Sequence, residues 1–376
     1  MLNEYRDAME MRHHERWFAS TCLTVVLLVW GNLSIRAQAP VAPSTSNSDR
    51  RAADLLAEGV KLAAQGQLAQ AEVVLEKARA ASPHNTEVLT ALAKVKGRIG
   101  ELPAAIALFR EVADATPHST DAHLNLAMAL ADSSDLNGAL AEVSKTIDLS
   151  PKLGLAHLNR ARILADLHRL DEATAEFARA SELAPKNPDC FFYWALVEKE
   201  RFNYAKESEL LRAAVKLQPH DEKLLNLLGE SLLNESKVSE AVAVWRRLLI
   251  INPNSSEATY SLSQALRATD APESKRLLER YHALQQREKQ LNQVNTLGNR
   301  AYEAFNDHRW AEAIAALREG ITLCGDCTMQ AKLHKNLGLA LCQSGDLHAG
   351  ESELRIALRL DPADRDILRA LAAIPH

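Results

Sequence analysis

Small and large apolar residues recur at fixed places in a 34-residue unit that repeats along the chain. Units that begin at residues 52, 86, 120, 154, 188 and 222 all have glycine or alanine at the eighth place, and five of the six have alanine at the twentieth. The twenty-fourth place holds a larger apolar residue: Leu75, Phe109, Val143, Phe177, Leu211 and Trp245. Small residues in both halves of a unit let two helices cross closely, and the larger residue fills the space towards the next unit. The pattern predicts one helical hairpin per unit.

Prolines mark the end of each predicted hairpin. Proline lacks a backbone N–H and clashes with the preceding turn, so it ends a helix. Six prolines follow one another with the same 34-residue period: Pro83, Pro117, Pro151, Pro185, Pro219 and Pro253. An irregular helical bundle gives no reason for this register, whereas a stack of repeated units that share a core does.

The period is disturbed in the last third of the chain. The separation between Pro253 and Pro362 exceeds three periods by seven positions, and the surplus falls between units that begin at 256, 294 and 331. Asp270-Ala271-Pro272 breaks the seventh unit early, and residues 274–293 are expected to form one long polar helix. We expect the array to bend or split near residues 270–295.

The chain resembles the tetratricopeptide repeat (TPR) family, whose 34-residue helix–turn–helix has small residues at places 8, 20 and 27 and proline at place 32. The third unit has Leu126-Ala127 at places 7 and 8, Ala139 at place 20 and Pro151 at place 32. The resemblance covers residues 52–362. It implies an all-α fold, a right-handed α-solenoid of about nine repeats.

The same resemblance gives a division of the chain. We expect repeats 1–7 over residues 52–291, repeats 8–9 over residues 292–362, and a C-terminal capping helix over residues 363–376. Residues 40–51 are mostly polar with two prolines, and we expect them to form a flexible linker.

Residues 1–39 have the pattern of an export signal. Residues 17–35 carry no charge, follow Arg12 and Arg16, and precede Ala37-Gln38-Ala39, which resembles a signal-peptidase site. A cleaved signal peptide and an uncut N-terminal signal anchor both remain open, because a proline follows the predicted cut and nineteen helical residues reach roughly 28 Å. Either way the positive-inside rule predicts an exported protein, periplasmic or secreted, with possible membrane attachment through residues 17–35.

Composition narrows the classes of function. Hydrophobic residues make up 47% of the chain but aromatic residues only 5%, so the apolar content is mainly alanine and leucine, as helices favour. The net charge of −5 lacks the positive excess that nucleic-acid binding needs. Neither a glycine-rich phosphate loop nor a Ser/His/Asp constellation at a recognisable turn is present. We therefore expect a protein that is not an enzyme and that needs no cofactor.

The TPR resemblance implies that the first helix of each repeat lines a concave groove. An asparagine amide can match both the N–H and the C=O of an extended peptide. Asparagine stands at place 6 in four repeats: Asn125, Asn159, Asn299 and Asn336. Tyr193, Leu227 and Ser261 interrupt this row. The alternative is that asparagine is simply common at this place.

Cations and aromatic residues accompany the asparagines in the predicted groove. Lys94, Arg98 and Arg162 would suit an acidic peptide or a C-terminal carboxylate, or they would form a solvated helix face. Exposed aromatic rings make good anchors for a partner, although some would pack between repeats. The aromatic candidates are Phe192, Tyr193, Tyr260, Tyr302 and Phe305.

Cysteine and histidine offer few candidates for chemistry. Cys324-Gly-Asp-Cys327 is a C-x-x-C motif between repeats eight and nine, and two cysteines this close should pair in an oxidising compartment. A structural clip is one interpretation and a catalytic dithiol the other. No histidine follows the motif and no second C-x-x-C accompanies it, so we expect neither covalent haem nor zinc. His123, His157 and His334, each at place 4, are expected to be half-buried spacers and not metal ligands.

These observations predict an exported TPR scaffold that binds a partner protein or peptide in its concave groove. Two alternatives remain open. One is a thiol–disulfide oxidoreductase that uses Cys324 and Cys327, and the other is a membrane-anchored envelope assembly subunit held by residues 17–35.

Overall fold

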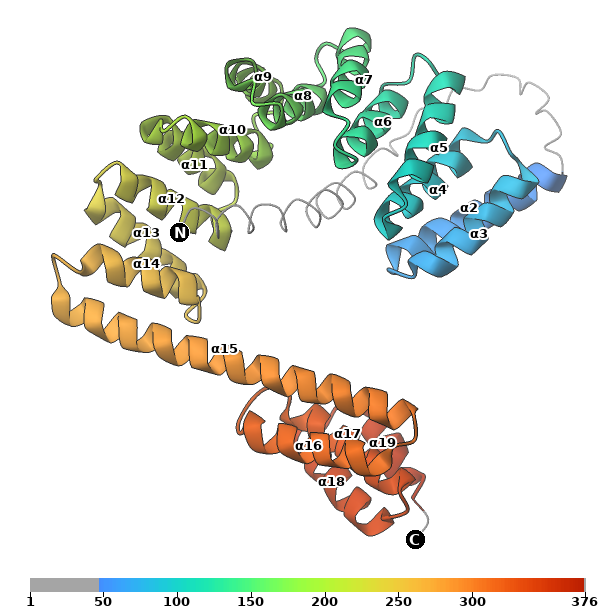
Figure 1. Ribbon diagram of the computed structural model, residues 1–376, viewed down its shortest axis with the longest axis vertical. Coiled ribbons are helices and arrows are strands. Elements are labelled where there is room, and N and C mark those ends of the chain that lie inside the picture. The colour runs from blue at the N-terminus through green and yellow to red at the C-terminus, as the bar shows by residue number, and fades with distance from the viewer. Residues whose placement is uncertain (1–46, 375–376) are drawn as a thin grey trace, which may run out of the picture. The chain divides into compact units, whose positions relative to one another are not determined.

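The computed structural model describes residues 47–374, which form eighteen helices and no strand (Figure 1). In chain order they are α2 (Asn47–Ala64), α3 (Leu68–Ala81), α4 (Thr86–Ile99), α5 (Leu102–Ala115), α6 (Thr120–Asp132), α7 (Leu136–Leu149), α8 (Gly154–Asp166), α9 (Leu170–Leu183), α10 (Pro188–Glu200), α11 (Tyr204–Leu217), α12 (Glu222–Asn234), α13 (Val238–Ile251), α14 (Ser256–Leu266), α15 (Ala271–Asn306), α16 (Trp310–Cys324), α17 (Gln330–Gln343), α18 (Leu347–Leu360) and α19 (Arg365–Ala372). The predicted all-α fold of paired helices is confirmed.

The chain forms two compact units, the first ending at Leu224 and the second beginning at Leu225. In the first unit consecutive helices pair as α2·α3, α4·α5, α6·α7, α8·α9 and α10·α11 (Figure 1). We call the first helix of each pair helix A and the second helix B. Four of the helices B, α3, α5, α7 and α9, also pack against the next helix A. The repeats therefore share their cores with their neighbours, as the 34-residue pattern predicts.

Turns at a constant place separate helix A from helix B. The fifteenth place of a repeat has left-handed backbone, and glycine occupies it at Gly66, Gly100 and Gly345. Other residues take the same conformation at Ser134, His168, Phe202, Ser236 and His308. Side chains cap many helix starts, as where the Asn85 side chain accepts hydrogen bonds from the backbone N–H groups of Glu87 and Val88 at 3.0 and 3.2 Å.

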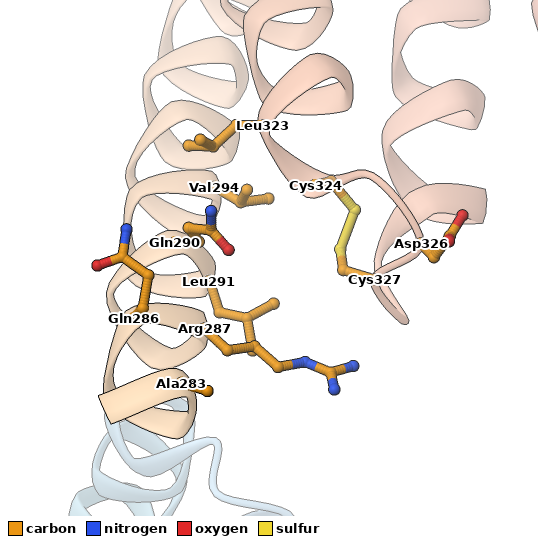
Figure 2. A pocket seen from close by; sticks show the side chains of 10 residues that line it. All are labelled: Ala283, Gln286, Arg287, Gln290, Leu291, Val294, Leu323, Cys324, Asp326 and Cys327. Carbon is orange, nitrogen blue, oxygen red and sulfur yellow. A yellow bond between two sulfur atoms is a disulfide. The ribbon is translucent and has the colours of Figure 1, made fainter. Parts of the chain in front are cut away.

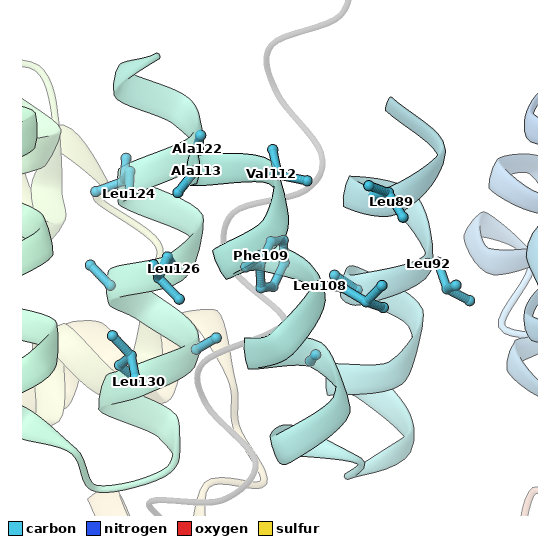
Figure 3. Close-up of a cluster of buried hydrophobic side chains, with 14 of the residues drawn as sticks. Leu89, Leu92, Leu108, Phe109, Val112, Ala113, Ala122, Leu124, Leu126 and Leu130 are labelled. Carbon is cyan, nitrogen blue, oxygen red and sulfur yellow. The ribbon is translucent and has the colours of Figure 1, made fainter. Parts of the chain in front are cut away.

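The core of the first unit lies between helix A and helix B of each repeat and also between helix B and helix A of the next repeat. Figure 3 shows Phe109 and Leu108 of α5 with Leu89 of α4 on one side and Leu126 of α6 on the other. The alanines at place 20 are fully buried where they allow this close approach: Ala71, Ala105, Ala139 and Ala173. The residues at places 20 and 24 are buried in these repeats, and Leu75 at place 24 packs against Gly59 at place 8 of its own repeat.

At the start of the second unit, helix B packs closely against helix A of its own repeat. Trp245 of α13 is 1% exposed, and its indole Nε1–H donates to the Asn226 side-chain oxygen at 2.9 Å. A Cβ atom at Gly229 would lie 2.5 Å from the Trp245 ring, so only glycine fits beneath the indole. The unit continues through α14 to α19, with each helix in contact with the next.

Helix α15 is longer than the sequence predicts. The long polar helix expected over residues 274–293 begins at Ala271 and continues to Asn306, a length of 36 residues. It packs against α14 and also against α16, so it serves as helix B of the seventh repeat and as helix A of the eighth. The place that holds proline in the first six repeats holds Arg287 here, so nothing ends the helix. The predicted division between residues 291 and 292 falls within it.

Two predictions concern the N-terminal part of the chain. The predicted linker over residues 40–51 ends earlier than expected, because α2 begins at Asn47 with Asp49 in its first turn, where a negative charge suits the helix dipole. The signal or anchor predicted for residues 1–39 lies outside the described residues. Within residues 47–374, no helix combines the length and the hydropathy that crossing a bilayer requires.

Candidate functional site

Helices α8 and α10 carry four of the predicted groove residues close to one another. Asn159 and Arg162 lie one turn apart on the same face of α8. The guanidinium carbon of Arg162 lies 4.2 Å from the centroid of the Tyr193 ring on α10, within the range of a cation–π interaction. Phe192 packs edge-on against Tyr193, with ring centroids 5.0 Å apart. This cluster is the most closely assembled part of the predicted groove.

Two carboxyl groups that the sequence did not single out flank Arg162. Burial raises the pKa of Asp132, the last residue of α6, to about 7, and the positive charge of Arg162 opposes the rise. Burial also raises the pKa of Asp189 on α10, opposed by Arg162 and then by Lys223. The charge of Arg162 is therefore already shared between two partly buried acids.

Asn159 is the most deeply buried of the asparagines at place 6. Its side chain is 3% exposed, and its amide nitrogen has no hydrogen-bond partner in the described part of the chain. Such a group is uncommon, because leaving a buried donor unpaired costs about 1–3 kcal/mol. Asn125, one repeat earlier, is half-buried.

The other two predicted cations have different surroundings. Arg98 donates from Nη1 to the backbone oxygen of Ala63 at 2.8 Å, which ties α4 to α2. Lys94 is exposed on α4. Within residues 47–374, neither Lys94 nor Arg98 shares a hydrogen-bond or ion-pair partner with Arg162 in any interaction described above.

The remaining predicted residues lie in the second unit. Tyr260 of α14 is 43% exposed and packs against Tyr281 of α15, with ring centroids 5.0 Å apart. Tyr302 of α15 is 68% exposed, Asn299 is exposed on the same helix, and Asn336 of α17 is half-buried. Phe305, by contrast, packs against Trp310. Within the second unit these residues are dispersed over three helices.

Comparison with known proteins identifies the repeats. The tetratricopeptide repeat family model matches residues 56–119, 90–154 and 124–188. The three matches overlap and together span residues 56–188, which are therefore TPR repeats. No curated protein matches it.

Solved structures of two TPR proteins and of a third protein, pilF, resemble parts of the chain. A thermophilic TPR protein of Thermus thermophilus has 22% identity and a TM-score of 0.42, covering 48% of this chain and 99% of its own. YrrB, described as a TPR protein with an unusual peptide-binding site, has 20% identity and a TM-score of 0.43, covering 47% and 92%. The pilF protein of Pseudomonas aeruginosa has 17% identity and a TM-score of 0.49, covering 59% and 99%.

Buried histidine–glutamate pairs lie inside three TPR repeats. Nδ1 of His123 lies 2.7 Å from Glu142 Oε2, nineteen residues further on, and Nε2 lies 3.0 Å from the Pro117 carbonyl oxygen. His157 repeats both contacts with Glu176 and Pro151, at 2.7 and 3.1 Å. His334 lies 2.6 Å from Glu353. All three histidines are 6–9% exposed, so they are more buried than the predicted spacers.

Sequence reasoning missed these pairs, although a signal for them was present. In each case histidine at place 4 accompanies glutamate at place 23 of the same TPR repeat. A neutral imidazole carries one N–H, so in His123 and His157 only the doubly protonated ring can donate to both acceptors. The pairs tie helix A to helix B and, in two repeats, to the preceding proline turn.

The two cysteines of the C-x-x-C motif are joined by a disulfide. Cys324 is the last residue of α16 and Cys327 lies in the loop before α17. Figure 2 shows this loop facing α15 across a cavity of about 470 Å³, which is lined by Leu291 and Val294 among others. The C-terminal end of a helix carries a partial negative charge, which disfavours the thiolate that redox catalysis needs.

Proposed function

We propose that this TPR protein is a scaffold that binds a segment of a partner protein along the helices A of its first unit. The observation that carries the proposal is the cluster of Asn159, Arg162 and Tyr193 on two neighbouring helices A. A buried amide without a partner and a stacked guanidinium offer hydrogen bonds to a ligand, while the aromatic rings offer an apolar surface.

A site-specific photo-crosslinker tests the proposal. Leu155, on the same face of α8 as Asn159, and Leu149 at the end of helix B α7 are each 38% exposed, so they form a matched pair. A photoreactive amino acid at Leu155 is expected to yield a discrete adduct in cells, and the one at Leu149 none. The adduct should be lost when Asn159→Leu is added. Equal labelling at both positions, or no adduct at Leu155, would contradict the proposal.

We also propose that residues 1–39 direct export of the chain, either as a cleaved signal or as an anchor. The support is the uncharged run over residues 17–35 behind two arginines. Fractionation with and without detergent, followed by N-terminal sequencing, tests this. A soluble product that begins near residue 38 or 40 indicates a cleaved signal, a detergent-dependent product indicates an anchored envelope subunit, and retention in the cytoplasm refutes export.

For the disulfide we propose a structural role and no enzymatic one. It closes a loop between two helices, and Cys324 lies at a helix C-terminus, where a reactive thiolate is disfavoured. Cys324→Ser together with Cys327→Ser is expected to leave partner crosslinking at Leu155 unchanged. Thiol–disulfide exchange activity that disappears in this variant would favour an oxidoreductase instead.

A further inference from the structure

Two half-buried carboxyls and one buried amide in the groove of the first unit lack the hydrogen bonds that buried polar groups normally make. We propose that they form a subsite for a basic side chain of the partner, a lysine ammonium or an arginine guanidinium, that enters between α6, α8 and α10. This inference rests on the proposed function and adds the chemistry of the partner at one position.

Asn159 provides the first part of the argument. It is 3% exposed, and its amide nitrogen makes no hydrogen bond with any residue among 47–374. It lies on the face of α8 that also carries Arg162, and Arg162 contacts the Tyr193 ring of α10. An amide can present either its oxygen or its nitrogen to a ligand, and the oxygen can accept a hydrogen bond from an incoming cation.

The carboxyls provide the second part. Asp132 and Asp189 are half-buried, and neither side chain makes a hydrogen bond or a close ion pair within the described residues. A partly buried carboxylate is stabilised most by a donor that is itself charged. Burial raises the pKa of Asp132 to about 7, so without a cation this carboxyl is only partly ionised at neutral pH.

Arg162, the cation already present, does not pair closely with either carboxylate. Arg162 is stacked over the Tyr193 ring, and its charge acts on Asp132 and Asp189 together. Nζ of Lys223 lies 4.3 Å from the Phe192 centroid, and the charge of Lys223 also acts on Asp189.

The ligand charge expected here is opposite to the one that the sequence suggests. Lys94, Arg98 and Arg162 suggested an acidic ligand, whereas Asp132 and Asp189 favour a basic one. A carboxylate entering beside Arg162 would face Asp132 and Asp189, and like charges at short range oppose binding. An ammonium or guanidinium would pair with Asp132 and donate a hydrogen bond to the side-chain oxygen of Asn159, once the amide presents that oxygen to it. Because Asp132 then ionises fully, binding at pH 7 releases a proton to solvent.

Peptide selection on the full chain tests the subsite. Short random peptides displayed on phage are selected against the wild-type protein, Asp132→Asn and the matched control Asp148→Asn, whose carboxylate is exposed on helix B α7. Wild type and Asp148→Asn are expected to enrich peptides with lysine or arginine at one fixed position, and Asp132→Asn is expected to lose that preference.

The enriched peptide then becomes the probe. Replacing its basic residue by norleucine should weaken binding to wild type by about tenfold or more, and binding to Asp132→Asn by less than about twofold. Calorimetry at pH 7 in two buffers of different ionisation enthalpy should show proton release for wild type and none for Asp132→Asn. Asn159→Leu replaces the amide by an apolar side chain of similar size. This variant should also lose the preference for a basic residue while remaining folded.

Contrary outcomes separate the two proposals. Enrichment of acidic residues, or of peptides without a fixed basic position, overturns the subsite and leaves the scaffold proposal standing. Failure of the full chain to select any peptide, together with no adduct at Leu155, overturns both.

Discussion

The first unit and the second unit treat the junction between consecutive repeats differently. In the first unit each helix B ends at a proline turn, after which helix A of the next repeat packs back against it. In the second unit α15 passes through the same place, which holds Arg287, without a turn. Because apolar residues recur on both sides of this junction, the pattern of the core does not decide whether the chain turns. The helix stop signal decides it.

This difference bears on where a binding site can form. Turns place the helices A of successive repeats beside one another, so α6, α8 and α10 contribute residues to one cluster around Arg162. In α15, helix A of the eighth repeat continues directly from helix B of the seventh. Tyr302 and Asn299 are exposed on this helix, and in the described part of the second unit they do not form a cluster like the one around Arg162. We therefore expect the first unit to dominate partner binding.

Arg287→Pro tests the role of the missing stop signal and has the largest expected effect. A proline inside a helix removes a hydrogen bond and clashes with the preceding turn, at a cost of about 3 kcal/mol. We expect faster hydrogen exchange in α15 and a broader spin-label distance between positions 275 and 303, which are about 42 Å apart along a straight helix. Arg287→Ala, which favours helix, should change neither quantity. An unchanged distance distribution in Arg287→Pro would contradict this account.

The histidine–glutamate pairs allow a comparison within the first unit. Repeat 2 has Leu89 and Leu108 at the places where repeat 3 has His123 and Glu142. His123→Leu alone leaves the half-buried Glu142 carboxylate with Lys145 as its remaining partner and should lower the free energy of unfolding by about 2 kcal/mol. Adding Glu142→Leu copies repeat 2 and should return stability to within about 1 kcal/mol of wild type. Equal losses in the single and double variants would refute the pairing.

The pH dependence of this pair has a definite sign. Burial would raise the pKa of Glu142, but hydrogen bonds from Lys145 and His123 outweigh it and lower the pKa. A carboxyl with a lowered folded pKa contributes stability above its unfolded pKa and loses it as the pH falls through the folded value. In urea denaturation from pH 6 to pH 3, wild type should therefore lose stability relative to the His123→Leu/Glu142→Leu variant.

How much the sequence predicts depends on whether an interaction repeats. Places 20, 24 and 32 encode packing between neighbouring elements, so the helical hairpins follow from the sequence alone. The groove places also pointed to Asn159, Arg162 and Tyr193. Asp132 and Asp189 did not stand out, because their importance comes from burial and from contacts between neighbouring repeats. No motif records partial desolvation of this kind.

Helix α15 shows a second reason why the sequence does not predict the whole fold. The sequence predicts a long helix after Asp270, but it also predicts a new repeat at residue 294, because the 34-residue register resumes there. Arg287 at the proline place was the signal that the two helices are one. The histidine–glutamate pairs could also be predicted from their constant separation of nineteen residues, once helix A and helix B were known to face each other at those places.

Removing the disulfide should affect the second unit only. A bridge that closes so short a loop restrains the unfolded chain by about 2 kcal/mol in the loop-entropy model. Cys324→Ser with Cys327→Ser should lose about this much protection from hydrogen exchange at the end of α16 and the start of α17, with no change in α4 to α8. Wild type under reducing conditions should match the variant. Loss of protection in the first unit would contradict the division of the chain at Leu224.

The smallest effect concerns a turn in the first unit. Phe202 has φ 58° at the place where Gly66, Gly100 and Gly345 stand in other repeats, and it is 77% exposed. Phe202→Gly relieves left-handed strain, and after the added entropy of the unfolded chain we expect a gain of about 0.5–1 kcal/mol. Phe202→Ala keeps the Cβ atom and therefore the strain, so it should give no gain. If alanine stabilised the chain as much as glycine, the gain would come from removing an exposed ring that lies 6.4 Å from Tyr204, and not from the backbone.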